Sequence, residues 1–419
     1  MKHFEAIIGY EDVKIELERV LDTIINNEKY EALGVKVPAG ILLHGAPGVG
    51  KTLFATTFLK NSGRPYFVCR KDRPDGEFIN EIKNVFEKAK EAAPSIVLLD
   101  DIDKFANATR RYSNDEEFVT VQSCIDEIKY EGKAVFVFAT ANEIDKLPES
   151  LTRPGRFDKI IEMDVPMTAD AAKIIKHYLS NKPVEKDLDF QELARILKGH
   201  SCSDLETIIN EAGIYSGFEG RNLITKADIL RAIMRIIFQA PEKIEVENDK
   251  YEYNVAVHEA GHALVNELLA SGSVNLVSIN RHAGGIEGIT SYFQDENYWE
   301  DMKYMENRVM ALLGGRAATE MKLGIVDVGV SSDMRRAYDI VARFVDNYCI
   351  HGFDKLERRN SSPSLIERKE MFIQSELDRY YLKVKRMIVE NMDFLDKIVN
   401  ALVEKKTITS ADIQALKSA

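Results

Sequence analysis

The chain has 419 residues, of which 45% are hydrophobic and 30% are charged, and its formal net charge at pH 7 is -12. A chain of this length exceeds what one hydrophobic core usually supports, so we expect two or three domains. The acidic balance argues against nucleic acid as a partner, because phosphate binding uses a basic surface, and the four cysteines form no CxxC pair that would suggest a disulfide framework or a cysteine zinc site.

The N-terminal part alternates apolar, strand-like runs with amphipathic helical segments. The runs are GILLHG from Gly40, PYFVC from Pro65, SIVLLDD from Ser95, AVFVFAT from Ala134 and KIIEMDV from Lys159. Because parallel strands need helical crossovers, this order predicts an α/β domain with a parallel sheet over residues 1–166. Helical patterns then replace the strand signals over 167–240, and the charged linker QAPEKIEVEND leads into a mainly α-helical region over 241–419.

A glycine-rich loop joins the first strand to the helical segment TLFATTFLK. Glycines let backbone N–H groups curl around phosphates, while Lys51 can reach the outer phosphates and Thr52 can place its hydroxyl on Mg²⁺. The pattern therefore predicts a nucleotide site. Its residues are Gly45, Ala46, Pro47, Gly48, Val49, Gly50, Lys51 and Thr52.

Two later strands also end in polar residues. Asp100 and Asp101 close SIVLLDD, where one carboxylate can hold the Mg²⁺ shell and its neighbour can orient an attacking water. Asn142 follows the strand VFVFATA, where an amide can sense the terminal phosphate. A buried strand often ends in an acidic turn that binds nothing. The glycine-rich loop upstream favours the other interpretation, in which these residues belong to a nucleotide site.

The segment LTRPGRFD carries Arg153 and Arg156 around a proline and a glycine. A surface arginine pair is usually just solvated. The Pro-Gly pair between these two favours side chains that project, and in a ring of subunits they would reach a neighbour's nucleotide.

The stretch YNVAVHEAGHALV places two histidines and a glutamate in an otherwise apolar helix. His258 and His262 are four residues apart, so a helix of 3.6 residues per turn carries both imidazoles on one face. Two neutral imidazoles and a third protein ligand leave a zinc ion one position for water, whose proton Glu259 can accept during attack on a peptide carbonyl. The alternative without a functional role is a pair of partly exposed helix histidines. Spacing alone leaves the third ligand open among the downstream carboxylates, which include Glu320, Asp327, Asp333 and Asp339.

Several motifs in a fixed order then point to a known family. GAPGVGKT, LLDDID, ATAN and RPGRFD resemble an AAA ATPase module, and GHSCSDLETIINEAG resembles its helical lid. With EAIIGYEDVKIELERV at the start and AVHEAGHALV, LLGGRAATE and VSSDMRRAYDIVARFV later, almost the whole chain resembles the FtsH family of ATP-dependent zinc metalloproteases.

The resemblance implies a multidomain protein: an α/β AAA ATPase subdomain, a small helical lid and a mainly α-helical zinc metalloprotease domain. It further implies ATP, Mg²⁺ and Zn²⁺ as cofactors, a hexameric homo-oligomer with Arg153 and Arg156 acting on the adjacent subunit, and polypeptide substrates. The family's third zinc ligand corresponds to Asp333. Glu320 is the second choice, because many HExxH enzymes recruit a downstream glutamate.

Three departures from the family pattern qualify these expectations. The family is normally anchored by N-terminal transmembrane helices, yet no segment approaches the ~20 apolar residues of a membrane span and no secretion signal begins the chain, so we expect a cytoplasmic protein or the cytoplasmic part of an anchored one. Asp101 stands where the family usually has glutamate, which predicts slow ATP hydrolysis. The stretch YFVCRKDRPDGEFINEIKNVFEKAK lacks the family's aromatic-hydrophobic-glycine pore loop.

These departures leave three functions to weigh. The first is an ATP-dependent zinc endopeptidase that moves polypeptides to its zinc site. The second is a peptidase on a nucleotide-gated scaffold that cuts without threading, which the missing pore loop motivates. The third is a non-proteolytic AAA chaperone, which would have no use for an intact HEAGH motif.

Overall fold

The chain folds into two compact units, Met1–Ile229 and Leu230–Ala419. The structure, a computed structural model, describes residues 2–35, 37–71, 77–106, 115–153, 155–239, 249–280, 288–293, 301–326, 328–352 and 362–418. The predicted division into a sheet subdomain (1–166), a helical lid (167–240) and a protease domain (241–419) stays a prediction.

The first unit contains the expected parallel sheet. Its strands are β1 (Gly40–Gly45), β2 (Tyr66–Arg70), β3 (Ser95–Asp100), β4 (Val135–Ala141) and β5 (Lys159–Met163). They form one five-stranded sheet in the order β2-β3-β4-β1-β5, and every pairing is parallel. Strands β3 and β4 are buried along their whole length, as near-continuous apolar runs in a covered parallel sheet should be. The α/β prediction and its five strands are therefore confirmed.

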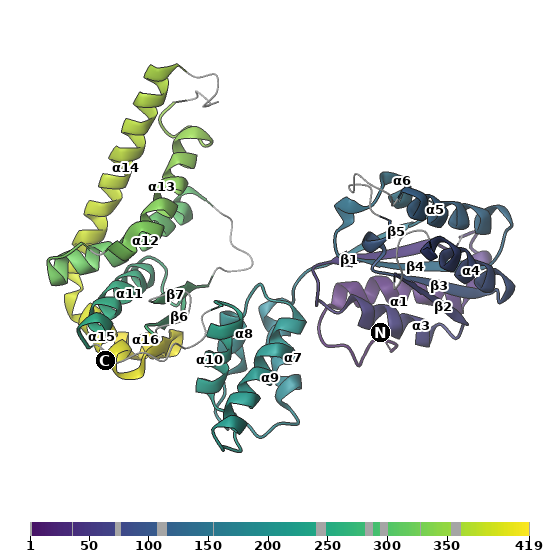
Figure 1. Ribbon diagram of the computed structural model, residues 1–419, viewed down its shortest axis with the longest axis horizontal. Coiled ribbons are helices and arrows are strands. Elements are labelled where there is room, and N and C mark those ends of the chain that lie inside the picture. The colour runs from purple at the N-terminus through teal and green to yellow at the C-terminus, as the bar shows by residue number, and fades with distance from the viewer. Residues whose placement is uncertain are drawn as a thin grey trace. The chain divides into compact units, whose positions relative to one another are not determined.

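Helices cover both faces of this sheet, with α1 and α3 on one side and α5 on the other (Figure 1). The helices of this part are α1 (Glu11–Ile25), α2 (Asn27–Glu31), α3 (Lys51–Asn61), α4 (Glu77–Glu91), α5 (Asp115–Tyr130) and α6 (Glu149–Thr152). Side chains of β1 alternate between the two faces of the sheet and so belong to two hydrophobic cores. Ile41 and Leu43 pack with α1 and α3, whereas Leu42 packs with α4 and α5. Because all five strands are parallel, their carboxyl ends lie at the same edge of the sheet.

Four helices follow the sheet: α7 (Thr168–Leu179), α8 (Phe190–Ile196), α9 (Cys202–Phe218) and α10 (Lys226–Ile236). Helix α9 begins with a capping box, in which the Ser201 hydroxyl accepts from the Asp204 amide and the Asp204 carboxylate accepts from the Ser201 amide. Just after that cap, the Ser203 amide donates to the Gly48 carbonyl at 3.1 Å. The start of α9 thus lies directly against the glycine-rich loop.

The second unit is mainly helical, as expected. Its helices are α11 (Asp249–Leu269), α12 (Met302–Leu323), α13 (Ser331–Asp346), α14 (Pro363–Glu390), α15 (Met392–Lys405) and α16 (Ser410–Ser418). A small antiparallel sheet in the order β7-β6-β8 is formed by β6 (Val274–Ser278), β7 (Ile289–Tyr292) and β8 (Thr407–Thr409). Within the described ranges, no helix is both long and apolar enough to span a bilayer.

Helix α11 is the central element of this unit. Its apolar residues are buried around its circumference, among them Ala256, Val257 and Ala260, each with 0% exposure. It approaches α12 so closely that a Cβ on Gly261 would lie 2.4 Å from the Gly314 carbonyl oxygen. This backbone contact explains why both positions are glycine, and it fixes the position of the helix that carries HEAGH.

Candidate functional site

A cavity of about 660 Å³ lies at the carboxyl edge of the parallel sheet, between the glycine-rich loop, the N-terminal segment and helices α7 and α9. Helix α3 begins at Lys51, directly after Gly50, whose φ of 103° is the left-handed conformation that glycine adopts without strain. A helix start exposes backbone N–H groups and the positive end of the helix dipole, which together bind phosphate. The cavity therefore has the position and size that a nucleoside triphosphate requires.

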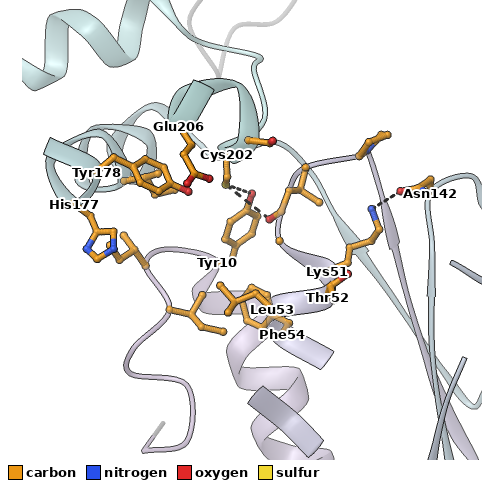
Figure 2. A pocket seen from close by; sticks show the side chains of 18 of the residues that line it. Tyr10, Lys51, Thr52, Leu53, Phe54, Asn142, His177, Tyr178, Cys202 and Glu206 are labelled. Carbon is orange, nitrogen blue, oxygen red and sulfur yellow. Dashed lines mark hydrogen bonds between the residues drawn. The ribbon is translucent and has the colours of Figure 1, made fainter. Parts of the chain in front are cut away.

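Lys51 lies at the inner end of this cavity. Its ammonium donates to the Gly45 and Ala46 carbonyls at 2.8 Å each and to Asn142 Oδ1 at 2.9 Å (Figure 2). Burial lowers the pKa of Lys51, although the carboxylates of Asp101, Asp103 and Asp100 oppose this shift. The lysine and the Asn142 amide are thus held together at the same strand edge, as the sequence suggested.

Asp100 is 3% exposed and accepts a 2.8 Å hydrogen bond from the Thr140 hydroxyl. The Thr52 hydroxyl lies 3.5 Å from the same carboxylate oxygen, so the two groups expected around Mg²⁺ face each other. The sequence gave Arg70 no role at this site. Arg70 ends β2 beside Asp100, with its guanidinium 3.0 Å from Asp100 Oδ2.

Asp101 adopts a left-handed φ of 54°, and its backbone N–H donates to Thr140 Oγ1 at 2.9 Å. One carboxylate oxygen lies 3.3 Å from the Asn142 amide nitrogen, and the other forms a 2.6 Å ion pair with Lys104. The turn therefore directs Asp101 toward the side chain that also contacts Lys51.

The far end of the cavity was not anticipated from the sequence. Tyr10, Tyr178, Cys202 and Glu206 gather there, and the Tyr10 hydroxyl lies 3.5 Å from the Cys202 sulfur (Figure 2). Burial raises the pKa of both the Tyr10 phenol and the Cys202 thiol, so both groups stay neutral. No spacing rule links residue 10 to residue 202, because only the packing of α9 on the glycine-rich loop brings them together.

The two arginines of RPGRFD differ in their surroundings. Arg153 is exposed and forms a loose 3.8 Å contact with Glu149. Arg156 forms a bidentate pair with Asp126, at 2.9 and 2.6 Å, and also donates to the Ser150 carbonyl. Within this chain, then, Arg153 projects and Arg156 is held.

In the second unit, α11 and α13 bring His258, His262 and Asp333 together. The Nε2 atoms of the histidines are 3.0 Å apart, and Asp333 Oδ2 lies 3.5 Å from that of His258 and 3.3 Å from that of His262. Tetrahedral coordination with bonds of ~2.0–2.1 Å separates neighbouring ligand atoms by about 3.3–3.4 Å. The three donor atoms therefore fit a zinc ion, and their chemistry matches that of zinc ligands in hydrolases.

Interactions of His262 and Asp333 hold both side chains in the forms that bind a metal. His262 Nδ1 lies 2.7 Å from the Ala311 carbonyl, which as an acceptor fixes the proton on Nδ1 and leaves the Nε2 lone pair free to coordinate. Burial by itself raises the pKa of Asp333, but the hydrogen bonds and charges of His258 and His262 outweigh it and lower that pKa well below its usual value. The two imidazoles thus favour the ionised form of Asp333, which is the form that binds a metal.

Space around the imidazoles is created by Gly315 on α12. A Cβ on this residue would lie 2.5 Å from His262 Nε2 and 2.6 Å from His258 Nε2. The sequence gave no sign of this role for Gly315.

Glu259 is 7% exposed and lies beside the histidine pair. Its Oε2 accepts a 2.6 Å hydrogen bond from the Thr290 hydroxyl on β7. A Cβ on Gly288 would lie 2.6 Å from Glu259 Oε1, so the chain entering β7 packs directly on this carboxylate. The contact with Thr290 orients Glu259, and the sequence gave no sign of it.

The other carboxylates considered as third ligand lie elsewhere. Glu320 accepts hydrogen bonds from Tyr381 and from Lys385, which together lower its pKa. Asp339 is exposed, and Asp327 falls outside the described residues. Among the described residues, His258, His262 and Asp333 are the group whose donor atoms converge.

Known proteins resemble both units of the chain. Residues 41–165 match the ATPase family associated with various cellular activities (AAA), and residues 245–416 match peptidase family M41. The ATP-dependent zinc metalloprotease FtsH 2 of Thermoanaerobacter sp. is 30% identical over 427 residues, covering 99% of this chain and 82% of that protein.

Two further relatives extend this similarity. The ATP-dependent zinc metalloprotease FtsH of Caldicellulosiruptor bescii is 30% identical over 443 residues, covering 99% of this chain and 71% of the relative. The chloroplastic ATP-dependent zinc metalloprotease FTSH 5 of Arabidopsis thaliana is 31% identical over 449 residues, covering 99% of this chain and 63% of the relative.

Proposed function

This chain belongs to the FtsH family of ATP-dependent zinc metalloproteases, and from that premise we propose which of its residues perform each step and how it acts on polypeptides. The protein is an ATP-dependent zinc metalloendopeptidase whose cofactors are ATP with Mg²⁺ and Zn²⁺. The assignment of individual residues is carried by one observation: three metal-binding side chains converge at 3.0–3.5 Å beside the buried carboxylate of Glu259.

ATP binds at the edge of the parallel sheet. The backbone of residues 45–52 and the ammonium of Lys51 would hold the phosphates, and Thr52 and Asp100 would hold Mg²⁺. Asp101 and Asn142 position the attacking water, which their 3.3 Å contact supports. Arg70 pairs with Oδ2 of Asp100 whereas the Thr52 hydroxyl faces Oδ1, so the two contacts use different oxygens of this carboxylate.

Peptide bonds are cleaved in the second unit. His258, His262 and Asp333 would hold a Zn²⁺ ion, which would supply Lewis-acid activation of water and of a peptide carbonyl. Glu259 accepts the proton of the attacking water and later delivers it to the leaving amine nitrogen. The hydrogen bond from Thr290 holds the Glu259 carboxylate in the orientation that both proton transfers need.

The active assembly is a hexamer in which Arg153 reaches the nucleotide of the adjacent subunit. Its exposure and its loose contact with Glu149 support this role, whereas Arg156 organises its own subunit through Asp126. Movement of an unfolded polypeptide toward the zinc site would follow from ATP hydrolysis around the ring. The cytoplasmic location expected from the sequence stays a prediction.

The deciding experiment measures the degradation of a labelled, permanently unfolded protein by the purified chain with zinc, with and without ATP. The matched control is Glu259→Gln, which should keep zinc but lose cleavage, whereas His258→Ala should lose zinc. Degradation that needs ATP and disappears in the control would support the coupled protease. Retained peptidase activity in the control would remove Glu259 as the base.

The same assay separates the two alternatives. Equal cleavage with and without ATP would favour the scaffolded peptidase that does not thread. A chain that binds no zinc after purification would favour the chaperone.

A further inference from the structure

The end of the nucleotide cavity next to the glycine-rich loop carries a continuous chain of polar side chains. Lys51 Nζ donates to Asn142 Oδ1 at 2.9 Å (Figure 2), and the Asn142 amide nitrogen lies 3.3 Å from Asp101 Oδ1. On the other side of the same carboxylate, Lys104 Nζ donates to Asp101 Oδ2 at 2.6 Å. All four residues line the cavity. The chain of contacts thus has an ammonium group at each end, and the one on Lys104 has no role in the proposed function.

The position of Lys104 follows from the turn that ends β3. After Asp101, with its left-handed φ of 54°, the chain forms the 3₁₀ turn η1 (Ile102–Lys104). The backbone N–H of Lys104 donates to the Asp101 carbonyl at 2.9 Å. Side chains three residues apart in such a turn lie one above the other, which places Lys104 over Asp101. The backbone therefore holds Lys104 at the wall of the cavity.

Carboxylates gather at this edge of the sheet. Asp100 and Asp103 are 3% and 7% exposed, and the Asp101 side chain is 16% exposed. The phosphates of ATP are themselves anionic, and a like charge nearby disfavours their binding unless a cation offsets it. Lys104 pairs with Asp101, which is the one of these three carboxylates that lines the cavity. The pair reduces the repulsion that a bound phosphate would meet.

The ammonium of Lys104 has hydrogen-bonding capacity left for a ligand. An ammonium group has three N–H donors, and the contact with Asp101 uses one of them. The Lys104 side chain is 57% exposed, which leaves its other donors accessible. Lys51 differs, because its ammonium donates to three oxygen atoms of the chain. Lys104 can therefore donate to a phosphate oxygen without giving up its present contact.

We propose that Lys104 binds the terminal phosphate of ATP and thereby helps the chain to distinguish ATP from ADP. The terminal phosphate is the one concerned, because Lys104 contacts Asp101, which is assigned to the water that attacks that phosphate. The inference rests on the proposed nucleotide site. It adds an ammonium group on the β3 side of the phosphates to that of Lys51 on the β1 side.

The chain itself supplies a matched control. Residues 101–104 read Asp-Ile-Asp-Lys, and residues 143–146, after the neighbouring strand β4, read Glu-Ile-Asp-Lys. Lys146 ends a second 3₁₀ turn, η2 (Ile144–Lys146), and pairs with Glu143 three residues earlier. The two lysines are thus equivalent in local structure. They differ in that Lys104 lines the cavity whereas Lys146 lies outside its lining.

The test measures the dissociation constants of ATPγS and ADP for the purified full chain by isothermal titration calorimetry. The variants are Lys104→Gln, Lys104→Arg and the control Lys146→Gln, and thermal unfolding checks the fold of each. Every titration is run with Mg²⁺ and again in excess EDTA, which separates contacts made by the chain from those made through the metal.

For Lys104→Gln we expect the affinity for ATPγS to fall about tenfold, the low end for a hydrogen bond to a charged group because Lys104 is exposed, while that for ADP stays within about twofold of the wild type. Lys104→Arg keeps the charge and the donors and should retain the preference for ATPγS, and Lys146→Gln should match the wild type. An equal loss of affinity for both nucleotides, or no loss for either, would overturn the proposal. So would the same loss in Lys146→Gln.

Failure of the nucleotide site itself would look different. In that case the wild type would bind neither nucleotide, or Lys51→Ala would bind both as tightly as the wild type does. A wild type that binds both nucleotides, with weaker binding in Lys51→Ala, leaves Lys104→Gln as a test of Lys104 alone.

Discussion

Replacing Gly315 by alanine should impair zinc binding without unfolding the protein. The new Cβ would lie 2.5 Å from His262 Nε2 and 2.6 Å from His258 Nε2, so the nearer imidazole must retreat by roughly 0.9 Å to reach an ordinary contact of 3.4 Å. Zinc sites tolerate distance errors of only about 0.2 Å. A displacement several times larger cannot be absorbed while all three ligands stay in place.

The expected loss in zinc affinity is at least the ~10–100-fold typical of a disturbed supporting residue, or about 1.4–2.8 kcal/mol. The fold should tolerate the change, because the colliding atoms are ends of side chains and alanine is favoured over glycine in a helix by about 1 kcal/mol. Zinc affinity is measured by competition with a chromogenic chelator, and stability by thermal unfolding of the metal-free protein.

Gly314→Ala is the matched control on the same helix. Its Cβ would lie 2.5 Å from the backbone oxygen of Gly261, which cannot move without separating α12 from α11. This variant should therefore unfold at a lower temperature even without zinc, whereas Gly315→Ala should not. Wild-type zinc affinity in Gly315→Ala would refute the reasoning, since it would mean that the imidazoles can coordinate from another position.

Three further predictions concern the first unit. Asp101→Glu should raise steady-state ATP turnover, because the added methylene brings the carboxylate closer to the attacking water, and a slower rate would contradict that role. Arg153→Ala should lower the ATPase rate of the assembled protein by more than about tenfold without changing the unfolding temperature. Arg156→Ala should instead lower the unfolding temperature. The reverse pattern would exchange the roles of the two arginines. Burial by itself raises the pKa of Asp228, but its contacts with Arg221, at 2.8 and 2.5 Å, help to lower that pKa from 3.8 to about 2. Asp228 therefore contributes about 2 kcal/mol of stability above pH ~4, which disappears as the pH falls through about 2. Asp228→Asn should flatten this acid limb in denaturant unfolding at a series of pH values, and an unchanged limb would rule the pair out as its source.

Much of the fold was readable from the sequence because it depends on local patterns. The five apolar runs of the first unit became its five strands, since a buried parallel strand must be apolar on both faces. Helix α11 carries His258 and His262 on one side because helical periodicity alone requires it. The glycine-rich loop lies before α3 for the same local reason, as its glycines permit the turn that starts that helix.

What the sequence determined by itself is therefore the chemistry: which residue types stand at helical or strand spacing, and hence a phosphate loop and a histidine pair. The tertiary structure decided which distant groups meet them. Asp333, on α13, reaches the histidines although Glu320 is closer along the chain, because Glu320 is held by Tyr381 and Lys385. Contacts of this kind join residues tens of positions apart, and they are set by how helices and strands pack into one core, which no spacing within a single segment encodes.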